Sequence, residues 1–134
     1  MPNALIVEDS AIFRKLLKET LLSGFPFLEV SEAADAEEAL LKINSLSPDL
    51  IFMDIKLPGE SGLDLTKKVK SKHPNIIIVI LTAYDVPEYR EAAYQFKADH
   101  FLSKGSASRE SILTLVDSIL SDRPIENSGL KSGS

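Results

Sequence analysis

The chain has 134 residues, enough for one domain with a hydrophobic core. Its net charge of −5 argues against direct nucleic-acid binding, and the absence of cysteine excludes disulfides, thiolate metal sites and cysteine nucleophiles. Its longest uninterrupted apolar run, residues 76–81, is far shorter than the roughly 20 residues of a membrane helix, so we expect a cytoplasmic protein without a membrane span.

Strand-like and helix-like patterns alternate from the start of the chain. Residues 4–7 form a short apolar run that predicts a strand. Ser10 is a suitable cap for the helix that follows, in which apolar residues recur every three or four positions. Residues 28–31 predict a weaker second strand. Asp35 and Glu38 have the spacing of a capping box and predict the start of a second helix.

The alternation continues through the second half. Residues 50–53 predict a third strand, and a loop rich in proline and glycine leads into a third helix. The β-branched run at residues 76–81 is typical of a central parallel strand that is covered on both faces. A fourth helix, a fifth strand at residues 100–103 and an amphipathic helix that begins at Ser106 or Ser108 complete the pattern.

Strict alternation of strands and helices predicts an α/β fold with parallel strands, right-handed crossovers and helices on both faces of the sheet. Five such units suit a flavodoxin-like (βα)5 fold with strand order 2-1-3-4-5. We assign residues 1–120 to this domain. Residues 121–134 are rich in Ser, Gly, Pro and Asn, and we interpret them as a flexible tail or the start of a linker.

Acidic residues follow two strands that this order makes neighbours. Glu8 and Asp9 come after the first strand and Asp54 after the third, so their carboxylates should converge. Carboxylates a few Å apart repel by about 4 kcal/mol at an effective dielectric near 20, and Mg²⁺ is the divalent cation that best suits such oxygen ligands. Thr82 and Lys104, at two further strand ends, add a hydroxyl and a cation. Together these residues predict a site for a phosphoryl group on a carboxylate.

The order of these residues resembles the CheY-like receiver domain of two-component response regulators, over residues 1 to about 120. The resemblance implies that Asp54 accepts a phosphoryl group from a sensor histidine kinase or a phosphotransfer protein. It also implies that Glu8, Asp9, Asp54 and the backbone carbonyl of Lys56 bind Mg²⁺. Such a domain is not an enzyme in the usual sense, because it catalyses only its own phosphorylation and dephosphorylation.

The resemblance further implies a switch. Thr82 and Lys104 would contact the phosphoryl oxygens, and Phe101 occupies the position of the switch aromatic. Motion of Thr82 would let Phe101 turn inward and remodel the surface of the fourth helix, the fifth strand and the fifth helix. The output would be an effector domain beyond the C-terminus, for example a helix-turn-helix domain, or a phosphorylation-dependent homodimer.

The sequence departs from the commonest receiver pattern in three places. Gly105 follows Lys104 where proline is frequent, so the cis peptide often found there is not implied. Lys97 stands where a glycine often ends the fourth helix. Phe101 lacks the hydroxyl of the tyrosine that is common at its position.

Two further residues are predicted to tune the lifetime of the phosphoryl group. Lys56 lies two positions after Asp54, and Tyr84 lies two positions after Thr82. Neither offers a carboxylate or amide suited to orienting a hydrolytic water, and both are long enough to shield a phosphoryl group. We therefore predict slow self-dephosphorylation, although side chains that point into solvent would have little effect.

Other functions compete with this interpretation. A phosphatase of the haloacid dehalogenase type needs a second acid two residues after the nucleophile, where this chain has Lys56. In a flavodoxin-like cofactor binder, Glu8 and Asp9 would repel the phosphate of the cofactor. The nearer alternative is a phosphorylation-independent interaction module on a receiver scaffold, and the complete set of phosphorylation residues argues against it.

Overall fold

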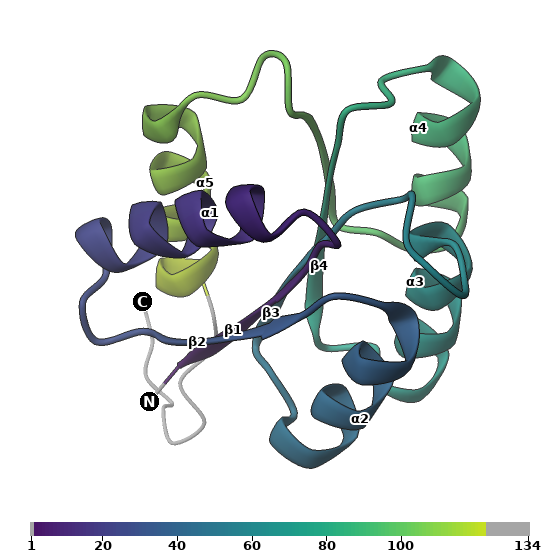
Figure 1. Ribbon diagram of the computed structural model, residues 1–134, viewed down its shortest axis with the longest axis horizontal. Helices are drawn as coiled ribbons and strands as arrows, with labels where there is room; N and C mark the ends of the chain where they lie inside the picture. Colours follow the sequence, from purple (N-terminus) through teal and green to yellow (C-terminus); the bar gives the residue numbers. More distant parts are fainter. Residues whose placement is uncertain (1, 123–134) are drawn as a thin grey trace.

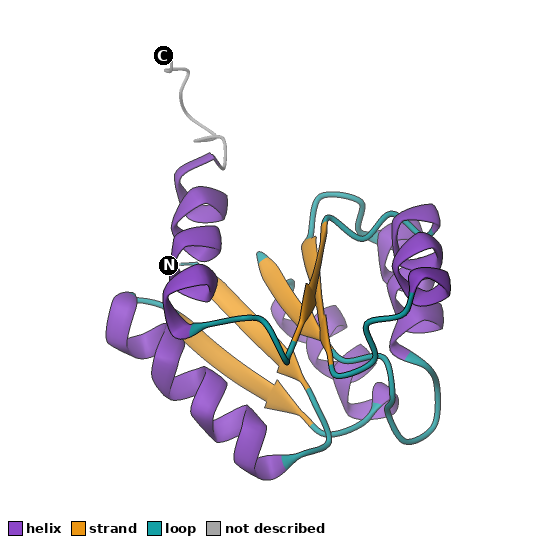
Figure 2. Cartoon of the chain, turned by 90° about the horizontal axis from the view of Figure 1, so that it is seen from above, coloured by secondary structure: helices purple, strands orange, loops and turns teal. Residues whose placement is uncertain are grey.

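The protein is a three-layer α/β structure with a five-stranded parallel sheet in the order β2-β1-β3-β4-β5. The computed structural model describes residues 2–122. Figure 1 shows helices on both sides of the sheet, and Figure 2 shows the same layers from above. The elements in chain order are β1 (Asn3–Val7), α1 (Ala11–Gly24), β2 (Glu29–Ala33), α2 (Ala36–Leu46), β3 (Leu50–Met53), α3 (Gly62–Lys72), β4 (Ile77–Thr82), α4 (Pro87–Gln95), β5 (His100–Ser103) and α5 (Arg109–Asp122). The predicted fold class and strand order are confirmed.

Each face of the sheet has its own core, because side chains alternate along the strands. Leu5 and Val7 of β1 point to the face that α2, α3 and α4 cover. Ala4 and Ile6 point to the opposite face, where they pack with α1 and α5. The central strands β1, β3 and β4 are almost wholly buried, which accounts for their continuous apolar runs. None of the helices within residues 2–122 has both the length and the apolar character that crossing a membrane requires.

The starts of α1, α2 and α5 follow capping residues that the sequence suggested. Asp35 caps α2, and its Oδ1 accepts a hydrogen bond of 2.8 Å from the backbone N–H of Glu38. The Glu38 carboxylate accepts from the N–H of Ala34 at 2.9 Å, one residue earlier than in the usual capping box. Of the two candidate starts for the last helix, the structure selects Ser108, whose hydroxyl accepts from the N–H of Ser111 at 3.0 Å.

The element ends differ slightly from the predicted ones. β2 runs two residues further than expected, and β4 begins and ends one residue later. Helix α5 continues to Asp122, so it includes the first two residues of the segment that we interpreted as a tail. The remainder of that segment, residues 123–134, lies outside the described residues.

Helix α4 is the least firmly anchored of the five. Its N-cap residue, Val86, makes no side-chain capping bond, and Ala93 is its one buried residue. Just beyond its end, Lys97 adopts a φ of 77°, in the left-handed region that favours glycine. This backbone conformation of Lys97 explains why glycine is frequent at the same position in receivers. The peptide bond between Lys104 and Gly105 is trans, like the others in residues 2–122.

Candidate functional site

The predicted acidic residues meet at the carboxyl-terminal edge of the sheet. Val7 and Met53 are register partners in β1 and β3, and the N–H of Asp54 bonds to the carbonyl of Val7 at 3.0 Å. Side-chain oxygens of Glu8, Asp9 and Asp54 all lie within 4.8 Å of one another. Glu8 and Asp54 are buried and Asp9 is exposed, so the cluster is open to solvent on one side.

Lys104 supplies the cation of this cluster. Its Nζ lies 2.6 Å from Oε1 of Glu8 and 3.3 Å from Oδ2 of Asp54. The same ammonium is 4.2 Å from the centre of the Phe13 ring, on α1. The N–H of Lys104 bonds to the carbonyl of Thr82 at 2.8 Å, which ties the end of β5 to the end of β4. Side chains from three strand ends are thereby held at one point.

The electrostatics of the cluster follow from three carboxylates beside one ammonium, which contacts Glu8 and Asp54. Burial raises the pKa of Glu8 and outweighs the hydrogen bonds from Lys104 and from the N–H of Ser10, while the negative charge of Asp54 raises it further. Burial alone would lower the pKa of Lys104. The contacts with Glu8 and Asp54 outweigh it, so the pKa of Lys104 is raised and the ammonium stays charged.

The cluster fits a hard divalent cation. Carboxylate oxygens are the ligands that Mg²⁺ prefers, and one ammonium leaves the three carboxylates with an excess of negative charge that a divalent cation would neutralise. Glu8, Asp9 and Asp54 would hold the ion. Lys56, whose backbone carbonyl is the other predicted ligand, lies in the loop directly after Asp54.

The predicted switch residues lie on β4 and β5, the two strands that lead to Thr82 and Lys104. Thr82, the last residue of β4, is fully buried, and its Oγ1 accepts a hydrogen bond of 3.3 Å from the N–H of Tyr84. Phe101 is only 5% exposed and already belongs to the core beneath α4. The guanidinium of Arg90 lies 4.5 Å from the centre of its ring. The ring therefore points inward here, and its turn on phosphorylation stays a prediction.

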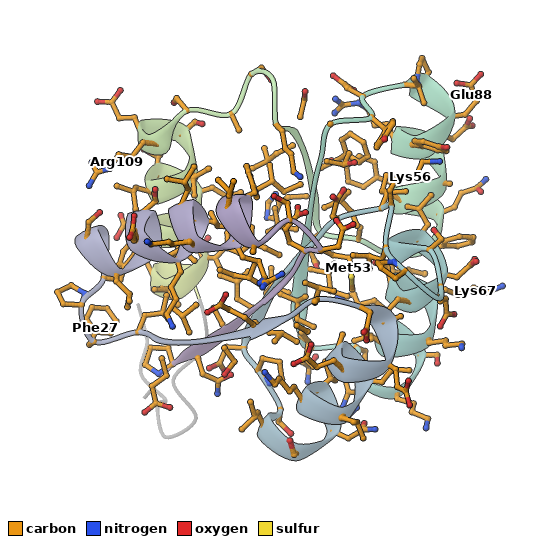
Figure 3. All side chains as sticks on the ribbon, in the orientation of Figure 1. Phe27, Met53, Lys56, Lys67, Glu88 and Arg109 are labelled. Carbon is orange, nitrogen blue, oxygen red and sulfur yellow. The ribbon has the colours of Figure 1, made fainter. Side chains whose placement is uncertain are left out.

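The two predicted tuning residues contact each other. Nζ of Lys56 lies 5.2 Å from the centre of the Tyr84 ring and 5.6 Å from that of Tyr89. Lys56 and Tyr84 are both exposed, whereas Tyr89 is half-buried. Figure 3 marks Lys56 just beyond β3, on the side of the molecule where α4 lies. The loop after β3 is thus linked to α4 by a lysine between two aromatic rings.

Two residues outside the predicted ligand set help to shape the site. A Cβ atom on Gly62 would lie 1.9 Å from the carbonyl oxygen of Asp54, so only glycine fits there. Arg14, on α1, donates from Nη1 to the carbonyl oxygen of Glu8 at 2.7 Å. The Pro-Gly-rich loop was a signal for Gly62. Arg14 gave no such signal, because a charged residue on the polar side of a helix usually faces solvent.

Comparison with known proteins assigns the family. The model of the response regulator receiver domain matches residues 4–117, so the chain belongs to this family. The receiver domain that the sequence resembled is thereby confirmed.

Two curated relatives illustrate how far the likeness extends. Response regulator GacA of Pseudomonas protegens is 31% identical over 112 residues, covering 84% of this chain and 53% of that protein. A protein-glutamate methylesterase/protein-glutamine glutaminase of Paramagnetospirillum magneticum is 38% identical over 96 residues, covering 72% of this chain and 27% of that protein. The chain thus spans about half or less of the length of these relatives.

Solved structures share the architecture. The response regulator protein TrrA from Thermotoga maritima, in complex with Mg²⁺ and a beryllofluoride, is 34% identical with a TM-score of 0.78 and covers 89% of this chain and 99% of its own. A CheY-like receiver domain protein from Methanospirillum hungatei is 28% identical with a TM-score of 0.83, covering 91% of this chain and 95% of its own.

Proposed function

We propose that Asp54 accepts a phosphoryl group, in a Mg²⁺-dependent reaction, from a histidine of a sensor kinase or phosphotransfer protein. The observation that carries this proposal is the convergence of Asp54 with Glu8, Asp9 and Lys104 at the carboxyl-terminal edge of the sheet. Attack of a carboxylate oxygen of Asp54 forms a P–O bond as the P–N bond of the phosphohistidine breaks. The leaving imidazole keeps the electron pair of that bond and takes up a proton.

The chain's own residues would position and neutralise the transferred group. Oδ1 of Asp54 accepts a bond of 2.7 Å from the N–H of Ile55, and Oδ2 is the oxygen nearer Lys104. Lys104 would offset negative charge on the phosphoryl oxygens. The Thr82 oxygen accepts from Tyr84, so its O–H is available to donate to a phosphoryl oxygen. A Mg²⁺ ion held by Glu8, Asp9, Asp54 and the Lys56 carbonyl would supply further positive charge.

The output would be a change of the surface that α4, β5 and α5 form. Phosphorylation would convert the Asp54 carboxylate into an acyl phosphate dianion next to Lys104 and Thr82, and these two residues would move towards it. Phe101 on β5 and Arg90 on α4, whose guanidinium lies 4.5 Å from the centre of the Phe101 ring, belong to two of the elements that form this surface. The change would be read by an effector domain, such as a helix-turn-helix domain, or by a second copy of the chain in a homodimer.

The proposal is tested by labelling the protein with acetyl phosphate or phosphoramidate in the presence of Mg²⁺. We expect one phosphoryl group by intact mass, located at Asp54 after borohydride reduction and peptide mapping. Asp54→Asn should abolish the label. Asp64→Asn should not, since Asp64 is an exposed aspartate on α3 that serves as the matched control. A label on a serine or on Asp9 would refute the assignment. No label at all would favour a phosphorylation-independent interaction module.

A further inference from the structure

We infer that Arg14 is a positioning residue for the cation site, and that Glu32 on β2 holds Arg14 in place. The inference rests on the proposed function, because it concerns the cation that Glu8 and Asp9 would bind. It assigns a role in that site to a helix residue and to an edge-strand residue that carry none of the predicted ligands.

Arg14 makes hydrogen bonds to the turn between β1 and α1. The geometry of this turn decides whether the carboxylates of Glu8 and Asp9 can converge. The backbone N–H of Arg14 bonds to the carbonyl of Ser10 at 2.9 Å as part of α1. Its side chain turns back, and Nη1 donates to the carbonyl oxygen of Glu8 at 2.7 Å. Arg14 therefore hydrogen-bonds to both ends of the segment from Glu8 to Ser10, which contains Asp9.

Every polar group of Glu8 has a hydrogen-bond partner. Its N–H bonds to the carbonyl of Ala33 at 2.9 Å, and its Oε2 accepts from the N–H of Ser10 at 2.8 Å. Oε1 faces Lys104, which leaves the backbone carbonyl to Arg14. Loss of Arg14 would leave this carbonyl without its charged donor and would free the turn to rotate.

Glu32 fixes the guanidinium from the other side. Nε of Arg14 lies 3.1 Å from Oε1 of Glu32, and the Arg14 side chain is 18% exposed. The planar guanidinium thus donates both to the Glu32 carboxylate on β2 and to the Glu8 carbonyl next to the acidic cluster. A lysine has a single charged nitrogen and cannot reproduce both contacts at this spacing.

The neighbouring Lys18 provides a natural control. Its Nζ lies 3.4 Å from Oε2 of the same Glu32, so it shares the acidic partner of Arg14. The hydrogen bonds of the described residues include none from Lys18 to Glu8. A change at Lys18 therefore alters the charge near Glu32 and leaves both hydrogen bonds between Arg14 and the turn in place.

The test is a Mg²⁺ titration of metal-free protein, followed by calorimetry, with wild type, Arg14→Met, Arg14→Lys and Lys18→Met. Removing a residue that orients metal ligands typically weakens metal binding roughly 10- to 100-fold. We expect a loss of that size for both Arg14 variants, because Arg14→Lys keeps the charge and loses the planar guanidinium. Lys18→Met should bind as wild type does. A folded Arg14→Lys protein with wild-type affinity would overturn the inference.

Two further readouts separate positioning from general destabilisation. The Mg²⁺ concentration for half-maximal labelling should rise in the Arg14 variants while the labelling rate at saturating Mg²⁺ stays close to that of wild type. In metal-free protein, the amide NMR signal of Ser10 should shift in Arg14→Met and stay in place in Lys18→Met. Unchanged values of both would count against a positioning role.

Should Arg14→Met fail to fold, Glu32→Gln carries the test, since it keeps the acceptor and removes the charge. It should weaken Mg²⁺ binding by less than the Arg14 variants, and wild-type affinity would overturn the role of Glu32. A wild-type protein that binds Mg²⁺ and takes no label on Asp54 would defeat the proposed function alone. A wild-type protein that binds no Mg²⁺ would defeat this inference.

Discussion

The ammonium of Lys56 lies 5.2 Å from the centre of the Tyr84 ring, so side chains from two different loops are in contact. The sequence suggested them as two separate shields. A cation–π contact at an exposed site contributes about 0.5–1 kcal/mol. This is enough to bias the positions of two side chains that would otherwise point freely into solvent, and Tyr89 adds a second ring at 5.6 Å.

This contact sharpens the prediction for the lifetime of the phosphoryl group. The double variant Lys56→Asn and Tyr84→Glu should lose phosphate faster than wild type, because it removes the shield and supplies groups that can orient a water. Each single variant already breaks the contact, so the two effects should not add. Phosphate release after removal of the donor measures the rates. Decay of the double variant at the wild-type rate would show that shielding is the wrong explanation.

Asp54→Asn should leave the metal-free protein at least as stable as wild type. The substitution removes one of three crowded carboxylates and keeps an oxygen that can accept from the N–H of Ile55. It loses part of the contact with Lys104, which at 3.3 Å is the longer of that ammonium's two ion pairs. Denaturant unfolding without Mg²⁺ measures the effect. A loss of more than about 1 kcal/mol would mean that the carboxylate has a structural role.

Magnesium should stabilise the protein, and the gain should shrink as the pH falls. Binding to the folded state alone raises the free energy of unfolding by mass action. Because burial raises the pKa of Glu8 above 4.5, protons compete with the metal for this ligand as the pH falls through that raised value. Thermal unfolding with and without Mg²⁺, across a pH series, follows this gain. Glu8→Gln with Asp9→Asn should remove it, and a persistent gain would place the metal elsewhere.

In metal-free protein, the raised pKa of Glu8 changes stability with pH in the opposite direction: its contribution to the free energy of unfolding falls as the pH rises. The folded state holds the Glu8 proton more tightly than the unfolded chain does, so the contribution of Glu8 to stability is greatest below pH 4.5. It declines as the pH rises through the raised pKa. The difference in unfolding free energy between wild type and Glu8→Gln should follow this course, and a difference that is flat with pH would contradict it.

Gly62→Ala should disturb the backbone of the phospho-acceptor. The new Cβ would lie 1.9 Å from the carbonyl oxygen of Asp54, so the loop must move. Overpacking of this kind costs about 1–3 kcal/mol, and we expect the upper part of that range because the obstructing atom is backbone. Gly105→Ala is the control, since its Cβ would meet only the Ser103 hydroxyl at 3.6 Å. Equal stability of the two variants would contradict the prediction.

The fold could be predicted from the sequence because its signals are local. Apolar runs, caps and strict alternation define the order of the elements, and the convergence of Glu8, Asp54 and Lys104 then follows from parallel topology. The role of Arg14 could not be found in this way. Its side chain turns back to Glu8 because Glu32, 18 residues away on β2, lies within reach, and no local pattern records that proximity.

The position of Phe101 was also beyond local signals. The sequence places it in a strand, and its register partner Ile80 in β4 fixes the face to which it points. Its cover comes from Arg90 on α4, the helix with one buried residue and no side-chain cap. How such a weakly anchored helix is placed depends on tertiary packing, which a single sequence does not display.

Two contacts hold the Arg90 guanidinium. It lies 4.5 Å from the centre of the Phe101 ring, and its Nη2 lies 2.9 Å from Oδ1 of Asp85. A displacement of the ring would leave the guanidinium tied to Asp85 alone, so a positive charge would shift on the outside of α4. Under the proposed function, a docking partner would then read the phosphorylation state through the position of this charge. Because exposed charges are screened over about 8 Å at 0.15 M ionic strength, we expect the preference of such a partner for the phosphorylated form to weaken as salt is added.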